Sequence, residues 1–194
     1  DRPGVAVWEA DFLELDIPGL LADQGIDKVV ANLPYNTGTR MLVELMRAPR
    51  PPRELVVTVQ REVGERLAAS AGDPAYGLLG VWRGSAYRVS WRRAISPTCF
   101  YPTPGVWSMA VKLDPLSPGQ RPHPAPPLFY ALTAHAFQHR RKQVAGILER
   151  APDPLRRPAA EVAAWLEAAG AGPRARPEEV TVAQWLAMTA WLET

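Results

Sequence analysis

The order of sequence patterns along this 194-residue chain predicts an α/β fold followed by a small all-helical domain. Strand-like and helix-like segments alternate as far as residue 113, which favours a parallel or mostly parallel sheet. From Asp114 to Pro127 the composition changes to Pro, Ser, Gly and Gln, as in a linker, and only helical periodicity follows. We therefore expect a first domain at 1–115, a linker at 116–127 and a second domain at 128–194.

The strands expected in the first domain are short runs that are either apolar and β-branched or that alternate apolar and polar residues. They lie at 4–10, 27–31, 54–60, 87–95 and 106–113. The apolar run at 28–31 does not alternate with polar residues, so we expect this strand to be covered on both faces. The last two strands have little helix between them and are expected to form an antiparallel edge.

Helical periodicity defines the remaining elements. The expected helices are 17–24, 37–47, 61–69 and 75–86 in the first domain, and 128–149, 159–169 and 177–193 in the second. Thr37 is expected to be the N-cap of its helix. The chain's one G-x-G sequence, Gly170 to Gly172, follows an expected helix, so we interpret it as a C-cap and turn.

The charge of the chain is distributed unevenly, although its net value is only +2. Residues 1–40 carry a net −4 and residues 161–194 a net −3, whereas residues 41–120 carry +4 and residues 121–160 carry +5. A polyanion such as RNA suits a surface built from the basic segments. A solvated basic face is the simpler explanation of the same excess.

The single cysteine, Cys99, excludes an internal disulfide framework. The sequence has no apolar run long enough to span a bilayer and no leader-like start. A reducing, cytoplasmic setting is therefore expected.

A polar turn of Asn32, Leu33, Pro34 and Tyr35 follows the strand expected at 27–31. Ligands of α/β sheets bind beyond the carboxyl ends of such strands. A nucleobase amino nitrogen is a poor nucleophile, and the Asn32 side-chain oxygen and the Leu33 carbonyl could hold its N–H groups. Pro34 would stiffen the turn and Tyr35 could stack on the base. The same pattern also occurs in ordinary loops.

Five stretches resemble, in order, segments of the ribosomal RNA adenine N6,N6-dimethyltransferase family, and of its small-subunit type in particular. They are Asn32-Leu-Pro-Tyr-Asn36, Gln60-Arg-Glu-Val-Gly-Glu-Arg-Leu67 with Ala75-Tyr-Gly77, Phe100-x-Pro102-x-Pro104-x-Val106-x-Ser108, Ala136-Phe-Gln-His-Arg-Arg-Lys142 and Val182-Ala-Gln184. The resemblance extends from Asp11 almost to the end of the chain. It implies a Rossmann-like S-adenosylmethionine methyltransferase sheet and a helical RNA-binding domain.

The resemblance also implies roles for individual residues. Asp11 and Phe12 would bind the adenine of S-adenosylmethionine, and Asn32 would contact both the methionine end of this cofactor and the target amino group. Tyr35 and Phe100 would sandwich the flipped target adenine. Without the family pattern, Phe100 would be interpreted as a core aromatic residue in a Pro-rich loop.

Two features of the family are not found in the chain. The glycine-rich cofactor loop and the acidic residue that holds the ribose should precede Asp1. We therefore expect the N-terminal part of the cofactor domain to be missing from this sequence. Gly105 and Trp107 also stand where the family tends to have polar residues.

Arg140, Arg141 and Lys142 are interpreted through the resemblance as RNA-binding residues on a helix. A solvated helix face is the alternative. His135 and His139 are spaced i, i+4, but Ala136 stands where a zinc-protease helix has Glu and no third ligand is evident. No metal site is therefore expected.

The function implied is S-adenosylmethionine-dependent N6-dimethylation of adjacent adenosines in a small-subunit (16S) rRNA hairpin, coupled to ribosome assembly. The enzyme is expected to be a monomer. One alternative is a large-subunit rRNA adenine N6-methyltransferase of the antibiotic-resistance type. The other is a non-catalytic RNA-binding or ribosome-assembly factor, which the missing glycine-rich loop favours.

Overall fold

The computed structural model describes residues 4–117 and 125–194. The first part contains η1 (Phe12–Glu14), α1 (Ile17–Asp23), β1 (Lys28–Asn32), α2 (Gly38–Arg47), β2 (Glu54–Gln60), α3 (Arg61–Ala68), α4 (Leu78–Gly84), β3 (Tyr87–Ile95), η2 (Pro97–Cys99) and β4 (Ser108–Pro115). The second part contains α5 (Pro127–Gln138), α6 (Val144–Glu149), α7 (Ala159–Ala168), η3 (Pro177–Glu179) and α8 (Val182–Leu192). Among these residues, no helix combines the length and the apolar character that crossing a bilayer requires.

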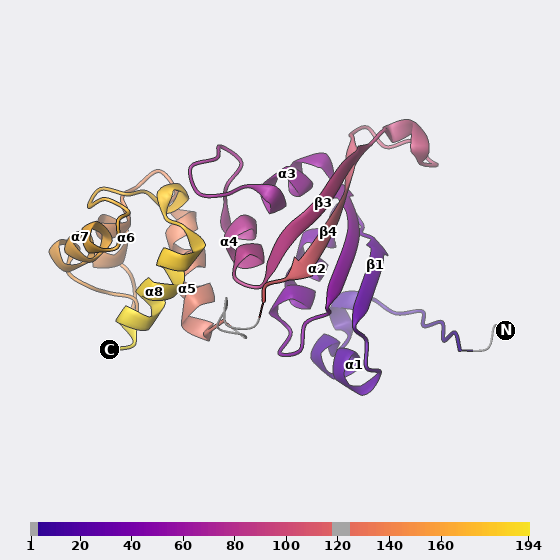
Figure 1. Cartoon of the computed structure of the whole chain (residues 1–194), viewed down its shortest axis with the longest axis horizontal. Helices are drawn as coiled ribbons and strands as arrows, with labels where there is room; N and C mark the ends of the chain where they lie inside the picture. Colours follow the sequence, from indigo (N-terminus) through magenta and orange to yellow (C-terminus); the bar gives the residue numbers. More distant parts are fainter. Residues whose placement is uncertain (1–3, 118–124) are drawn as a thin grey trace.

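The strands form one four-stranded sheet in the order β1-β2-β4-β3 (Figure 1). β1 and β2 are parallel, whereas β4 is antiparallel to both β2 and β3. The expected antiparallel pairing of the last two strands is confirmed, but the expectation of a mostly parallel sheet is wrong for the described residues. β4 follows β3 through a loop and lies between β2 and β3, and an antiparallel return of this kind needs no crossover helix.

Helices α2, α3 and α4 lie on one side of the sheet (Figure 1). Alternate residues of β2, Leu55, Val57 and Val59, are buried in the core on this side. In β1, Val30 points to the opposite face and is 80% exposed. The expectation that β1 is covered on both faces is therefore wrong in this structure, because an apolar run reports the capacity of a strand to be buried and not the presence of a covering layer.

Residues 4–10 do not form a strand, contrary to the expectation. Within the described residues no strand pairs with them, and Val5, Val7 and Trp8 are exposed. β-branched and aromatic residues favour a strand only where a neighbouring strand supplies hydrogen bonds and a surface to pack on. The composition of this segment therefore did not determine its structure.

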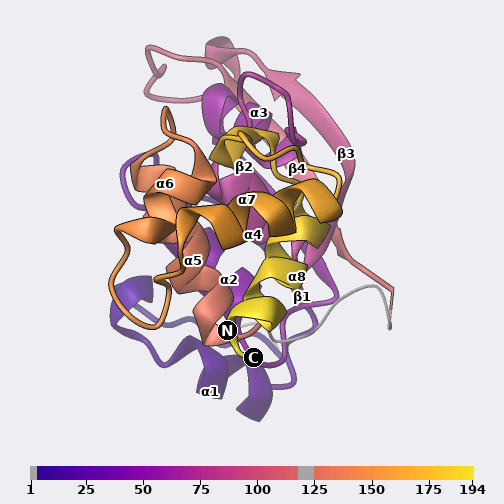
Figure 2. The ribbon, with the colours of Figure 1, turned by 90° about the vertical axis from the view of Figure 1, so that its left-hand side faces the viewer.

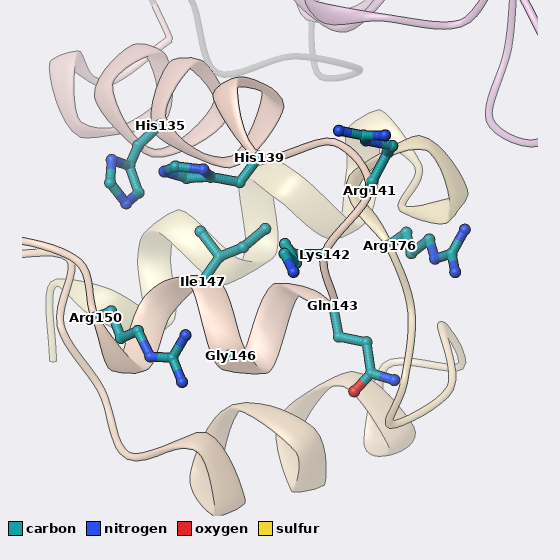
Figure 3. A pocket seen from close by; sticks show the side chains of 9 residues that line it. All are labelled: His135, His139, Arg141, Lys142, Gln143, Gly146, Ile147, Arg150 and Arg176. Carbon is teal, nitrogen blue, oxygen red and sulfur yellow. The ribbon is translucent and has the colours of Figure 1, made fainter.

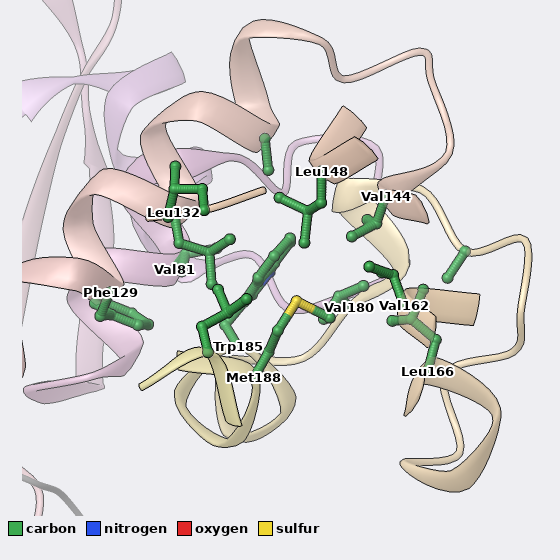
Figure 4. Packing of buried hydrophobic residues seen from close by; sticks show 14 of the residues in the cluster. Val81, Phe129, Leu132, Val144, Leu148, Val162, Leu166, Val180, Trp185 and Met188 are labelled. Atoms are coloured by element: carbon green, nitrogen blue, oxygen red, sulfur yellow. The ribbon is translucent and has the colours of Figure 1, made fainter. Parts of the chain in front are cut away.

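The helices of the second part surround Trp185, which is fully buried (Figure 4). Phe129 from α5, Leu148 from α6 and Leu166 from α7 belong to the same core. In Figure 2 the helices of the second part face the viewer and lie in front of the sheet. The core also contains Tyr76 and other residues that precede the expected linker, so residues 128–194 do not build it alone. Residues 118–124 of that linker lie outside the described residues.

The helices expected at 75–86, 128–149 and 177–193 differ from the observed ones. The first starts only at Leu78, after a turn. The second is interrupted at 139–143, between α5 and α6. The third begins as the separate turn η3, because the Thr181 hydroxyl accepts a hydrogen bond from the Gln184 N–H and starts a new helix there.

Two predicted helix ends can be compared with the structure. Gly170 follows α7 with a φ of 74°, and the N–H groups of Gly170 and Ala171 bond to carbonyls in the last turn of α7. The predicted C-cap is thus confirmed. Thr37 occupies the N-cap position of α2, as predicted, but its side chain makes no capping hydrogen bond.

Helix α4 lies between the sheet and the helices of the second part (Figure 1). Val81 belongs to the helical core, and Trp82 packs against both cores. The Trp82 indole donates a hydrogen bond to the Thr133 hydroxyl of α5 at 3.0 Å, and the Arg47 guanidinium lies 4.3 Å from the ring centre of Tyr130. These contacts fix α5 against the first part of the chain.

We predict that Gly38→Ala destabilises the chain. A Cβ atom on Gly38 would lie 2.7 Å from the Cβ of buried Leu33, and overpacking of this kind costs about 1–3 kcal/mol. Urea unfolding measured by tryptophan fluorescence tests this. Gly146→Ala in α6 is the matched control, because its Cβ would meet nothing within 4 Å. Equal losses of stability in the two variants would contradict the prediction.

Candidate functional site

The candidate site begins where β1 ends and α2 starts. Asn32 is the last residue of β1, and the next residue, Leu33, is 4% exposed. The Leu33 N–H donates to the Thr58 carbonyl of β2 at 3.0 Å, and the Pro34 carbonyl accepts from the Gly38 N–H at 2.7 Å. The turn is therefore held on both sides of Leu33, while Asn32 and Pro34 are left exposed.

A cavity of about 290 Å³ joins this turn to the loop before β4. We call it the motif cavity; it is lined by Asn32, Leu33, Pro34, Tyr35, Phe100, Tyr101, Pro102 and Pro104. The structure thus places Tyr35 and Phe100, which are far apart in sequence, in the lining of one cavity. Its volume is at the lower end of the range for small-molecule sites, which starts at about 300 Å³.

A hydrogen bond positions Tyr35 in the motif cavity. Its hydroxyl oxygen lies 2.6 Å from that of Ser108, which is fully buried at the start of β4. Asn32, by contrast, forms no side-chain hydrogen bond within the described part of the chain and is exposed. The cavity therefore combines a positioned aromatic ring with a free amide. The sequence motif contained Ser108, but its role in holding Tyr35 was missed.

Asp11 and Phe12 are not among the residues that line the motif cavity. The Asp11 carboxylate accepts a hydrogen bond from the Leu13 N–H at 2.9 Å and caps η1. Phe12 is half-buried against the core beneath the sheet. Both residues thus have structural roles of their own, and η1 lies against α2, the helix that follows the motif.

A second cavity, of about 530 Å³, lies between α5, α6 and the loop before η3 (Figure 3). We call it the basic cavity; its charged or titratable lining residues are His135, His139, Arg141, Lys142, Arg150 and Arg176. Among the residues that the structure describes, no carboxylate lines it. Within the described residues, the four Arg and Lys side chains have no ion pair. An uncompensated positive charge of this kind favours an anionic ligand.

The segment Arg140–Lys142 lies in the turn between α5 and α6. The expectation that it lies on a helix is wrong, because the chain reverses here so that Val144 can reach the helical core. The Arg140 guanidinium donates to the Pro74 carbonyl at 3.0 Å and lies 3.6 Å from the Glu178 carboxylate. Arg140 does not line the basic cavity, whereas the two residues after it do.

Sequence reasoning missed several residues of the basic cavity. Arg176 comes from the loop before η3, so only the tertiary structure brings it to Lys142. His135 and His139 were considered as a metal pair; their ring centres are 5.4 Å apart, and no group of three metal-binding side chains occurs in the described ranges. Burial, and secondly the charge of His139, lower the pKa of His135.

Comparison with known sequences shows the family. A sequence profile of the family "Ribosomal RNA adenine dimethylase" matches residues 2–193. The "Ribosomal RNA small subunit methyltransferase A" of Synechococcus sp. (strain RCC307) is 38% identical over 172 residues, which are 86% of this chain and 61% of that protein. The protein of the same name from Bordetella avium (strain 197N) is 37% identical over 188 residues, 95% of this chain and 66% of its own length. The chain thus spans less than two thirds of these relatives.

Two solved structures share the fold. A dimethyladenosine transferase from Plasmodium falciparum has a TM-score of 0.66 at 19% identity, and the match covers 86% of this chain and 68% of that chain. The 23S rRNA methyltransferase ErmE has a TM-score of 0.60 at 21% identity, with coverages of 86% and 65%. Both confirm the predicted Rossmann-like α/β fold. The profile match over nearly its whole length shows that this chain belongs to the ribosomal RNA adenine dimethylase family.

Proposed function

We propose that the protein transfers methyl groups from S-adenosylmethionine to N6 of adjacent adenosines in a small-subunit rRNA hairpin. We also propose that it acts in the cytoplasm during ribosome assembly. The observation that carries the proposal is the motif cavity, in which Asn32 and Tyr35 meet Phe100. The names of the small-subunit methyltransferase relatives support this choice of RNA.

In this proposal the target adenine enters the motif cavity between the rings of Tyr35 and Phe100. The Asn32 side-chain oxygen and the Leu33 carbonyl accept its two amino N–H bonds. Among the described residues, no backbone N–H donates to that carbonyl. Two acceptors favour a tetrahedral nitrogen, whose lone pair is withdrawn from the ring and available for attack. The site thus acts by alignment and polarisation, without a strong base.

S-adenosylmethionine supplies a methyl group that its sulfonium already activates. We propose that Asp11, Phe12 and Asn32 contribute to holding it. These residues fit the role, because one Asp11 oxygen caps η1 while the other has no partner in the described part of the chain, and the Asn32 amide is free. Calorimetric titration with S-adenosylmethionine tests the assignment. Micromolar binding would exclude a cofactor-free assembly factor.

We further propose that the basic cavity contacts RNA phosphates through Arg141 and Lys142, with Arg150 and Arg176 from neighbouring segments. Arg140 is proposed to contribute less to this binding. Glu178 offsets its charge, and its guanidinium is engaged by the Pro74 carbonyl.

We predict that Asn32→Ala lowers methyl transfer about 100-fold or more, as does the loss of one preorganised polar contact in other enzymes, while RNA binding persists. The measurement is the transfer of labelled methyl groups by the natural protein to unmethylated small and large ribosomal subunits. Asn36→Ala is the control, because Asn36 lies in the same turn but outside the cavity lining. Retained transfer by Asn32→Ala, or transfer to large subunits alone, would contradict the proposal.

We predict that the double variant Arg141→Gln, Lys142→Gln weakens RNA binding and lowers its salt dependence. The slope of log K against log salt should decrease by about 1 for each lost phosphate contact. Binding isotherms at several salt concentrations measure it. Arg140→Gln removes one positive charge from the neighbouring position and should leave the slope nearly unchanged, whereas each single variant, Arg141→Gln or Lys142→Gln, should lower it by about 1. A slope unaffected by the double variant would assign both residues to a solvated surface.

We predict that RNA binding strengthens as the pH falls below about 6.5, the ordinary pKa of histidine. Because the pKa of His135 is lowered, its imidazole takes up a proton only below that value, and this proton adds positive charge to the basic cavity. His135→Gln should reduce this increase while leaving the affinity at pH 7.5 nearly unchanged. Equal pH profiles for the variant and the original chain would contradict the prediction.

A further inference from the structure

The loop between η2 and β4 exposes three large apolar side chains within a short stretch. Tyr101 is fully exposed, Val106 is 45% exposed and Trp107 is 48% exposed. Clustered apolar exposure of this kind marks binding surfaces more often than single exposed residues do. Within the described residues, neither aromatic side chain pairs with another ring.

This loop borders two hollows. Tyr101, Pro102 and Pro104 line the motif cavity. Val106 and Trp107 line a neighbouring hollow of about 480 Å³ at the start of α3. The loop therefore separates the place proposed for the target adenine from a second space of larger volume.

Both ends of the loop are anchored. The Phe100 N–H donates to the Pro97 carbonyl at 3.1 Å, and the Trp107 carbonyl accepts from the Arg61 N–H of α3 at 2.9 Å. The exposed rings thus belong to a loop that is held at both ends. Little conformational entropy is therefore lost by the loop when a ligand covers these rings.

A flipped adenine stays covalently attached to the nucleotides on either side of it, and these must pass the rim of the cavity. Tyr101 stands at that rim, directly after Phe100, which is only half-exposed. We propose that residues 101–107, the aromatic loop, bind the single-stranded RNA beside the target adenosine. Tyr101 stacks on the adjoining base, and Trp107 stacks on a base further along the strand. This inference rests on the proposed function.

The arrangement suits separate bases better than a protein partner. Tyr101 lines the motif cavity, whereas Trp107 lines the neighbouring hollow, so the two rings border different spaces and do not form one continuous face. Every base offers a flat apolar face, and loss of one stacking contact weakens binding by about 5- to 150-fold. A protein interface of useful affinity needs a contiguous, fully desolvated apolar centre.

The test uses the full chain and rRNA hairpins that keep adenosine at the target position and carry 2-aminopurine, whose fluorescence responds to stacking, at a flanking position. Tyr101→Ala and Trp107→Ala should each change the signal of a flanking probe at saturating protein and weaken binding by about 5- to 150-fold. Tyr101→Phe keeps the ring and should bind within about twofold of the original chain, because stacking uses the ring face and not the hydroxyl. Thr103→Ala, in the same loop, is the control without an aromatic ring.

Two outcomes are separable. Flanking probes that do not respond to Tyr101→Ala or Trp107→Ala would overturn the aromatic-loop inference, even if Tyr35→Ala weakens hairpin binding. Hairpin binding that neither Tyr35→Ala nor Phe100→Ala weakens would overturn the proposed function. Failure of the chain to bind the hairpins at all would overturn both.

Discussion

Burial of Leu33 is the constraint on which the candidate site depends. Its side chain fills the core beneath the sheet, its N–H is bonded to β2, and Gly38 leaves room for it because glycine has no Cβ. With the middle of the motif held in this way, Asn32 and Tyr35 are left to line the cavity beside it. A turn that is fixed by packing needs no reordering when a ligand arrives, which is the advantage of a preorganised site.

Helix α4 has a comparable role between the two parts of the chain. Trp82 packs against the sheet core and the helical core at once, and its indole bonds to α5. Arg47, at the end of α2, adds a cation–π contact with Tyr130 of α5. The motif cavity and the basic cavity are consequently held at a defined separation. In the proposed function, one RNA would have to present its target adenosine and its phosphates with matching spacing.

The neighbours Arg140 and Arg141 show why charge counted along a sequence is a poor guide to binding. Both carry the same charge, but Arg140 lies against Glu178 and the Pro74 carbonyl, while Arg141 faces a cavity without a carboxylate. Partners of a charge come from segments that are distant in sequence. The significance of Arg140 for the fold, and of Arg176 for the cavity, could therefore not be predicted from neighbouring residues.

The sequence by itself determined the family and most of the helices and strands, because local periodicity and ordered motifs carry that information. The family resemblance also predicted that Tyr35 and Phe100 share a site, and both line the motif cavity. Tertiary structure decided the rest. Residues 4–10 have strand-like composition but no pairing strand, and β1 is apolar but has an open face. The direction of β4, the break between α5 and α6, and the partner of Arg140 likewise depend on contacts between distant segments, which no local pattern encodes.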